Sequence, residues 1–314
     1  MNYLKDYREG EKFVGTYLCK QKQILKTKAG KTYYSLTLQD KTGTADGKIW
    51  ELNNGIANFE PMDYIHCEGM VTSFQGNLQM NISRVRISDE GEYDPADYVP
   101  CTNKDVGEMF SRILKYVASV QNKYLRKILE MYFVENKEFV DAFKKHSAAK
   151  SVHHGFMGGL LEHTLSVTDM CQYFAEHYPM IHRDLLITAA LFHDMGKIQE
   201  ISDFPMNDYT DDGQLLGHIY IGARCMENAA AQIPNFPPKL KNELVHCILA
   251  HHGKMEFGSP KVPAIMEAMA LHMVDNADAK LQTLTEVFTQ AGDNMGWLGF
   301  NRMFESNLRK TSEE

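Results

Sequence analysis

The chain has 314 residues, of which 44% are hydrophobic and 24% charged, and its formal net charge at pH 7 is −8. This length exceeds that of most single domains and favours two. The negative charge excludes a broadly basic nucleic-acid coat, although a local basic groove remains compatible with it. No stretch resembles a membrane span, and the polar start MNYLKDYREGEK is unlike a signal peptide, so we expect a cytoplasmic protein with no membrane partner.

The first ninety residues have the pattern of a small antiparallel β domain. Alternating runs predict strands near residues 12–25, 32–39, 45–51, 63–74 and 78–87. Turn sequences such as AGK at 29–31 and QGN at 75–77 separate them. Five short strands with a helix-like insert near residues 55–59 favour a five-stranded OB-type β-barrel. We therefore assign residues 1–90 to an OB-fold nucleic-acid-binding domain.

The pattern changes after residue 90. The stretch SDEGEYDPADYVPCT at 88–102 is acidic and contains two prolines, which is typical of a linker, here assigned to residues 91–103. Beyond it, apolar residues recur at helical spacing, as at Phe110, Ile113, Leu114 and Val117, and helical signals continue to about Leu308. Residues 104–314 are therefore predicted to be an all-helical domain, which gives a multidomain β plus all-α protein.

Twelve of the thirteen histidines follow residue 145, so the chemistry is expected in the helical domain. In LFHDMGK a His-Asp pair ends an apolar run, where an unpartnered buried polar group would cost about 1–3 kcal/mol. The ligand-type residues that interrupt such segments are His163, His193, Asp194, His218, His251, His252 and Asp275. Imidazoles and carboxylates suit Mn²⁺, Fe²⁺ or Zn²⁺. Seven ligands are too many for one ion, and they suit two ions about 3.5–4 Å apart.

The ordered series H…HD…H…HH…D resembles the HD-domain superfamily of metal-dependent phosphohydrolases, whose signature is a His, a His-Asp doublet and a later Asp. The additional His218 and the pair His251–His252 look like the two-metal branch of that superfamily. An OB-like module ahead of the motifs GGLLEHT, FHDMGK and GQLLGH closely resembles the YhaM-type 3′–5′ exoribonucleases of Gram-positive bacteria over nearly the whole chain.

The resemblance implies how the ligands divide between two divalent ions, with Mn²⁺ the first choice and Fe²⁺ or Zn²⁺ as alternatives. One ion would take His163, His193, Asp194 and Asp275, and the other His218, His251 and His252, with Asp194 bridging. Asp194 and Lys197 are the implied catalytic residues, and Lys197 would neutralise charge on the scissile phosphate. Lys197 follows Asp194 by three residues, the spacing of one helical turn. The alternative is a solvated lysine after a helix stop at Gly196.

The run KQKQILKTKAGK contains lysines and no acid, and OB folds bind single strands along a cationic face with aromatic stacking. The candidate nucleic-acid-binding residues are Lys20, Lys22, Lys26, Lys28, Lys31, Tyr33, Tyr34, Trp50 and Phe74. Because alternation buries one face, we expect at least half of these aromatic residues in the core. A solvated lysine face is the alternative. His153 and His154 are candidates for contact with a phosphate or the leaving sugar, or are ordinary loop histidines.

The predicted function is a metal-dependent 3′–5′ exoribonuclease that degrades single-stranded RNA, with single-stranded DNA as a further substrate, to nucleoside 5′-monophosphates. Polarity and product rest on the resemblance alone. One rival is an HD phosphohydrolase acting on a cyclic dinucleotide or a nucleotide, which needs no OB module. Another is a nucleic-acid-binding adaptor with a degenerate HD core, which the complete ligand series disfavours. The sequence leaves open the native metal, the preference between RNA and DNA, the base preference and a homo-oligomeric state. It also leaves open whether the OB module binds substrate or mediates assembly.

Overall fold

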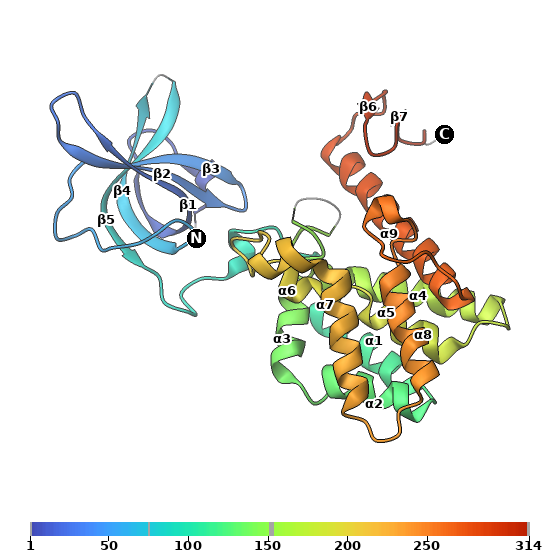
Figure 1. The fold of residues 1–314 in the computed structure, drawn as a ribbon. Helices are drawn as coiled ribbons and strands as arrows, with labels where there is room; N and C mark the ends of the chain where they lie inside the picture. The colour runs from blue at the N-terminus through green and yellow to red at the C-terminus, as the bar shows by residue number, and fades with distance from the viewer. Residues whose placement is uncertain (1, 75, 151–153, 313–314) are drawn as a thin grey trace. The chain divides into compact units, whose positions relative to one another are not determined.

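The computed structural model describes residues 2–74, 76–150 and 154–312. The chain divides into two compact units. One consists of Met1–Cys101 with Phe204–Met206, and the other of Thr102–Asp203 with Asn207–Glu314. Figure 1 shows the strands of the first unit in blue to cyan and the helices of the second in green to red. In the ranges that the structure describes, no helix is long and apolar enough to cross a membrane.

The first unit is a closed five-stranded barrel. Its strands are β1 (Lys12–Lys26), β2 (Thr32–Asp40), β3 (Gly43–Ile49), β4 (Tyr64–Phe74) and β5 (Asn77–Ile87). They follow the order β1-β2-β3-β5-β4, in which β4 returns to pair antiparallel with β1 and β3 pairs parallel with β5. This is the Greek-key arrangement of an OB barrel. The predicted fold class is therefore confirmed, and the strands begin and end close to the predicted positions.

The helical insert predicted at residues 55–59 is not formed. Instead, the segment runs beside β5, where Ile56 forms an isolated parallel bridge with Val85. Val85 donates its N–H to the carbonyl of Gly55 at 2.9 Å, and its own carbonyl accepts from Ala57 at 3.0 Å. Strand-like pairing thus satisfies the backbone polar groups that a helix would otherwise satisfy. It also places Phe59 in the barrel core.

The second unit is built from helices. They are α1 (Val106–Ser119), α2 (Lys123–Phe133), α3 (Lys137–Lys145), α4 (Gly159–His177), α5 (Arg183–Phe192), α6 (Lys197–Glu200), α7 (Asp211–Ala231), α8 (Pro238–Ala250) and α9 (Met266–Gln290). A short 3-10 turn occurs in this unit at Met255–Phe257, and two others lie in the first unit at Leu4–Asp6 and Pro95–Asp97. Side chains at the N-caps Asp105, Asn122, Asn136 and Thr210 accept hydrogen bonds from free backbone N–H groups. These caps explain where their helices start.

Helix α5 is the central helix of this unit. Every residue from Leu185 to Phe192 is buried, and the helix packs against α4, α8 and α9. A helix that is apolar on all sides is typical of a protein core, because only there can all of its apolar side chains be shielded from water. Its C-terminal end therefore delivers the next residues, His193 and Asp194, into the interior.

The C-terminal segment differs from the prediction of helix up to about Leu308. Helix α9 ends at Gln290, and a small hairpin of β6 (Phe300–Asn301) and β7 (Ser306–Asn307) follows. The physical reason is Gly292, which adopts a φ of 52° directly after the C-cap. A left-handed residue at this position stops a helix.

Candidate metal centre

Five segments bring the seven predicted ligands into one buried region of the helical unit. Helix α4 carries His163, and the turn after α5 carries His193 and Asp194. Helix α7 carries His218, α9 carries Asp275, and His251 and His252 follow the last residue of α8.

One group of donor atoms surrounds the Oδ2 oxygen of Asp194. This oxygen lies 3.4 Å from Nε2 of His163 and 3.4 Å from Nε2 of His193. Oδ1 of Asp275 lies 3.2 Å and 3.8 Å from the same two nitrogens. The donor atoms of His163, His193 and Asp275 are all within 4.8 Å of one another, so a single cation could contact all of them.

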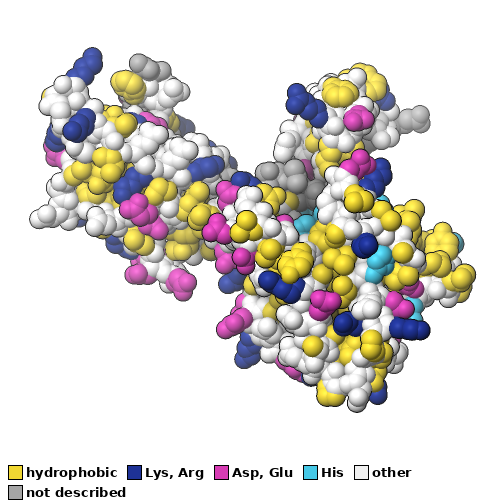
Figure 2. Space-filling view, in the orientation of Figure 1, with side chains coloured by type: hydrophobic (Ala, Val, Ile, Leu, Met, Phe, Trp, Pro, Cys, Tyr) yellow, Lys and Arg dark blue, Asp and Glu magenta, His cyan; other side chains and the backbone are white. Residues whose placement is uncertain are grey.

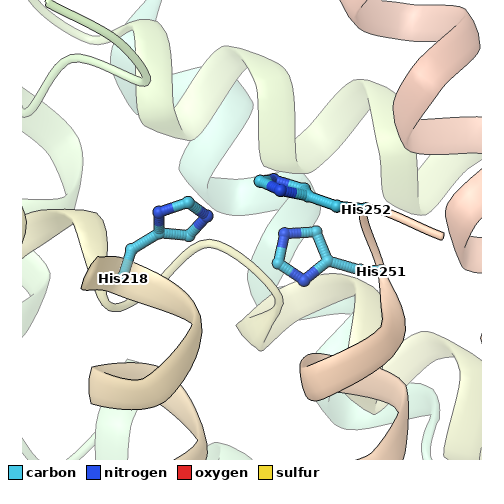
Figure 3. A group of neighbouring side chains, drawn as sticks. All are labelled: His218, His251 and His252. Atoms are coloured by element: carbon cyan, nitrogen blue, oxygen red, sulfur yellow. The ribbon is translucent and has the colours of Figure 1, made fainter. Parts of the chain in front are cut away.

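A second group of donor atoms surrounds the other oxygen of Asp194. Oδ1 lies 3.5 Å from Nε2 of His218 and 3.6 Å from Nε2 of His251. These three atoms are buried and have no hydrogen-bond partner in the part of the chain that the structure describes. The ring of His252 completes the group, and Figure 3 shows the three imidazoles around a common space. Unsatisfied buried polar atoms cost about 1–3 kcal/mol each, so their convergence fits a bound cation.

The outer nitrogens of three rings fix which nitrogen faces the centre. Nδ1 of His193 bonds to the carbonyl of Ala190 at 2.8 Å, and Nδ1 of His251 to that of Ile248 at 2.7 Å. Nδ1 of His252 bonds to the carbonyl of Phe257 at 2.8 Å. A carbonyl oxygen can only accept, so Nδ1 donates and Nε2 of the neutral ring keeps a lone pair. Metal-binding histidines are held in this way.

Carboxylates hold the other two rings. Nδ1 of His163 lies 2.7 Å from Oδ2 of Asp278, whose second oxygen accepts from the hydroxyl of Ser166. Nδ1 of His218 lies 2.9 Å from Oε1 of Glu200. The spacing of one helical turn between Asp275 and Asp278 is a signal in the sequence for Asp278. The sequence contains no comparable signal for Glu200.

The charges at the centre follow from burial and proximity. Burial alone would raise the pKa of Asp194, but the Lys197 ammonium and the neighbouring histidines hold it well below its ordinary value. Burial opposes the charge on Lys197, yet the Asp194 carboxylate keeps the pKa of that lysine raised. Burial and the adjacent His251 lower the pKa of His252 to about 4. At neutral pH the His252 ring is therefore uncharged, with a free lone pair.

Lys197 faces Asp194 across one helical turn. Its Nζ lies 2.8 Å from Oδ2 of Asp194, and its side chain is only 12% exposed, so it is not a solvated lysine. Gly196 does not stop the helical path, because its φ of −64° and ψ of −19° are right-handed helical. It does allow a close approach, since a Cβ there would lie 2.1 Å from the carbonyl oxygen of His218.

His154 is a neighbour of His163 and of Asp278. Its ring is buried, with its centroid 5.2 Å from that of His163 and Nδ1 3.9 Å from Oδ2 of Asp278. Its backbone N–H donates to Oε1 of Glu286 on α9 at 3.2 Å. His153 lies outside the described residues.

Comparisons with known proteins agree with this geometry. The HD domain family model matches residues 160–280, which include all seven predicted ligands. The 3′–5′ exoribonuclease YhaM of Geobacillus sp. (strain WCH70) is 32% identical over 257 residues, covering 81% of this chain and 78% of the relative. The protein of the same name from Bacillus subtilis (strain 168) is 32% identical over 262 residues, covering 81% of each chain. The chain belongs to the YhaM 3′–5′ exoribonuclease family.

Membership in the YhaM family confirms the resemblance that the motifs indicated. Together with the HD match it identifies the class of enzyme, a nuclease of the HD phosphohydrolase superfamily. Among solved structures, the second OB-fold domain of replication protein A from Methanococcus maripaludis is 20% identical. It covers 29% of this chain and 98% of its own length, with a TM-score of 0.24.

In the barrel of this YhaM-family chain, Tyr33 and Trp50 form an aromatic pair. Their ring centroids are 4.6 Å apart in a stacked arrangement, and Trp50 is 40% exposed. Nε1–H of Trp50 donates to Oδ1 of Asn81 at 3.0 Å, which fixes the ring. Phe74 at the end of β4 is 61% exposed. The expectation that at least half of the aromatic candidates lie in the core is therefore not met.

Lys22 and Tyr34 lie on the inner side of the barrel. In the β1–β2 register Lys22 pairs with the buried Leu36, and Tyr34 stands two residues before Leu36 on the same face, where it packs against the barrel core. Nζ of Lys22 donates to the carbonyl of Phe59 at 2.5 Å, and its side chain is 11% exposed. The remaining lysines of the run, Lys20, Lys26, Lys28 and Lys31, are exposed. Figure 2 shows dark blue side chains at the tip of the β1–β2 hairpin.

Proposed function

We propose that this protein is a metal-dependent 3′–5′ exoribonuclease that degrades single-stranded RNA to nucleoside 5′-monophosphates at the HD centre, with single-stranded DNA as a further substrate. The observation that carries the proposal is the convergence of two groups of donor atoms on the two oxygens of Asp194. The curated relatives named 3′–5′ exoribonuclease support the direction and the substrate.

The donor atoms fit two divalent cations. His163, His193 and Asp275 would hold one ion with Oδ2 of Asp194, and the second would lie among His218, His251, His252 and Oδ1. Imidazole and carboxylate ligands suit Mn²⁺, Fe²⁺ and Zn²⁺, and we propose Mn²⁺ as the first choice. When bound, such a pair of ions supplies a nucleophilic water at neutral pH and stabilises charge on the attacking and leaving oxygens.

Asp194 and Lys197 are the proposed catalytic residues. Asp194 stays ionised at neutral pH and offers one oxygen to each group of histidines. The ammonium of Lys197 has three N–H donors, one of which faces Oδ2 of Asp194 at 2.8 Å. The others are able to donate to the phosphoryl oxygens, where negative charge develops during hydrolysis. A preorganised donor in a buried site stabilises that charge more strongly than water does.

The barrel is the proposed binding module for single-stranded RNA. The stacked and partly exposed pair of Tyr33 and Trp50 offers an aromatic platform, and base stacking on such rings contributes about 1–3 kcal/mol per base. The proposed contacts also include Phe74 and the exposed lysines Lys20, Lys26, Lys28 and Lys31. Lys22 and Tyr34 are left out of the proposed contacts because they face inward.

The test uses a single-stranded RNA labelled at its 5′ end and the full-length protein with Mn²⁺. We expect a descending ladder of labelled products and release of nucleoside 5′-monophosphates, both abolished by a chelator and by Asp194→Asn. The matched control is Asp211→Asn, which changes an exposed carboxylate at the start of α7. This variant should produce the same ladder as wild type. Intact RNA together with hydrolysis of a small phosphodiester would favour a nucleotide-specific HD enzyme. Absence of both activities would favour an adaptor.

A further inference from the structure

Helix α7 is distorted directly before His218. Gly217 has a φ of 73° and a ψ of 153°, values that L side chains rarely adopt and that glycine tolerates. At this distortion the backbone N–H of His218 donates to the Oε1 oxygen of Glu200 at 3.0 Å. The kink thus turns a backbone donor of α7 toward a side chain that lies 18 residues earlier in the sequence.

The same oxygen of Glu200 holds the imidazole of His218. Oε1 lies 2.9 Å from Nδ1 of the ring, and the Glu200 side chain is almost completely buried. An ionised carboxylate can only accept, so the ring proton resides on Nδ1. Nε2 is left with a lone pair and faces Oδ1 of Asp194 at 3.5 Å. One oxygen therefore fixes both the backbone and the ring of His218.

Glu200 is itself held firmly. It is the last residue of the single-turn helix α6, whose first residue is Lys197. Its carbonyl accepts from the backbone N–H of Thr210 at 3.0 Å, and a Cβ on Gly213 would lie 2.1 Å from that carbonyl oxygen. The short helix thus presents two side chains to the centre, with Lys197 bonded to Asp194 and Glu200 to His218.

The role of Glu200 can be tested by substituting a single side chain. The rings of His193, His251 and His252 are held by backbone carbonyls, which a side-chain substitution cannot remove. The ring of His218 is held by a side chain, so its support can be deleted while the ligand itself remains.

We infer that Glu200 is a positioning residue, which keeps the proton of His218 on Nδ1 so that Nε2 is ready to bind a metal ion. The inference rests on the proposed function to the extent that His218 is a metal ligand there. Residues that orient metal-binding histidines typically contribute about 10–100-fold to metal affinity. Glu200 acts through His218 and has no proposed contact with the RNA.

The test compares Glu200→Met, which retains side-chain length and removes the acceptor, with Glu200→Gln, whose amide oxygen can still accept. Nitrogen-15 NMR of the metal-free protein should show Nδ1–H on His218 in wild type and in Glu200→Gln, and a mixture of both tautomers in Glu200→Met. Calorimetric titration with Mn²⁺ should show one of two ions weakened by about 10–100-fold in Glu200→Met only. Glu227→Ala, an exposed acid on α7, is the matched control. If Glu200→Met does not fold, Glu200→Ala takes its place.

Unchanged nitrogen shifts and unchanged Mn²⁺ affinity in Glu200→Met would overturn the inference. So would a Glu200→Gln protein with the same defects as Glu200→Met, because a retained acceptor should rescue the ring. The proposed function fails separately: a wild-type protein that binds two ions but leaves RNA intact refutes the exonuclease and leaves the role of Glu200 standing.

Discussion

Gly196 offers the sharpest test of how the metal centre is packed. It lies between the proposed catalytic residues Asp194 and Lys197, and its hydrogen faces the backbone of α7. A Cβ at this position would lie 2.1 Å from the carbonyl oxygen of His218 and 2.9 Å from the nitrogen of Gly222. Neither atom belongs to a flexible side chain. In Gly196→Ala the turn and helix α7 must therefore separate by roughly 1 Å, because close-packed interiors have no void to absorb the methyl group.

The magnitude follows from two opposing effects. Overpacking of this kind costs about 1–3 kcal/mol of unfolding free energy. Alanine would also stabilise the folded state by about 0.5–1 kcal/mol relative to glycine, because the dihedral angles at position 196 are helical. A contact of 2.1 Å with a backbone oxygen belongs to the upper part of the range for overpacking, about 2–3 kcal/mol, so the net loss is about 1–2.5 kcal/mol. Such a loss lowers the melting temperature by about 2–10 °C for a unit of this size. The shift also separates Lys197 from His218, and a displacement of about 1 Å can reduce activity about 10²-fold.

The assay combines thermal unfolding followed by circular dichroism with Mn²⁺-dependent hydrolysis of RNA. Gly222→Ala is the matched control, because its Cβ would meet Ile248 at 3.6 Å and Met195 at 3.7 Å, which are ordinary contacts. This control should melt at or above the wild-type temperature and keep its activity. Equal stability and activity of Gly196→Ala and Gly222→Ala would show that the methyl group does not displace α7.

Three further predictions concern single side chains. Lys197→Met should lower kcat for RNA by about 10²–10³-fold, the scale of one lost charge-stabilising donor, without changing the metal content; an unchanged kcat would remove Lys197 from the chemistry. His252→Ala should bind one divalent ion fewer than wild type, as measured by elemental analysis, whereas substitution of the exposed His177 by alanine should not change the number of bound ions. Equal metal contents in the wild type and both variants would contradict the assignment of His252 as a ligand. Tyr33→Ala should weaken RNA binding by about 5–150-fold, corresponding to about 1–3 kcal/mol of stacking, and leave hydrolysis of a small phosphodiester unchanged; equal losses on both substrates would indicate a folding defect instead.

The sequence predicts those features that local patterns determine. Alternation along TYYSLTLQD marks β2 because successive side chains of a strand point to opposite faces, and the strand is observed at Thr32–Asp40. The seven ligand-type residues stand out because His and Asp interrupt apolar helical runs, where an unpartnered polar group is costly. The structure brings all seven into one region, with Asp194 between the two groups of donor atoms.

Other features depend on contacts between distant segments, and no local pattern announces them. The backbone N–H of His218 reaches Glu200 at the point where Gly217 distorts α7. The carbonyls that hold the rings of His193, His251 and His252 carry no side-chain signal. Lys22 faces inward because of the barrel register, which shifts at an irregularity between Cys19 and Gln21. A lysine in a basic run is thereby removed from the outer surface. Helix α9 ends before the predicted position, because Gly292 adopts a left-handed conformation. The amino-acid composition of this segment does not reveal that conformation.

Asp194 is proposed to hold two metal ions, one at each of its carboxylate oxygens. The most direct measurement is a crystal structure of the protein grown with Mn²⁺, with diffraction data collected at the manganese absorption edge. We expect two anomalous peaks about 3.5–4 Å apart, one beside each oxygen of Asp194. The first should contact His163, His193 and Asp275, and the second His218, His251 and His252. A single peak, or peaks that lie away from Asp194, would show that Asp194 does not hold two ions.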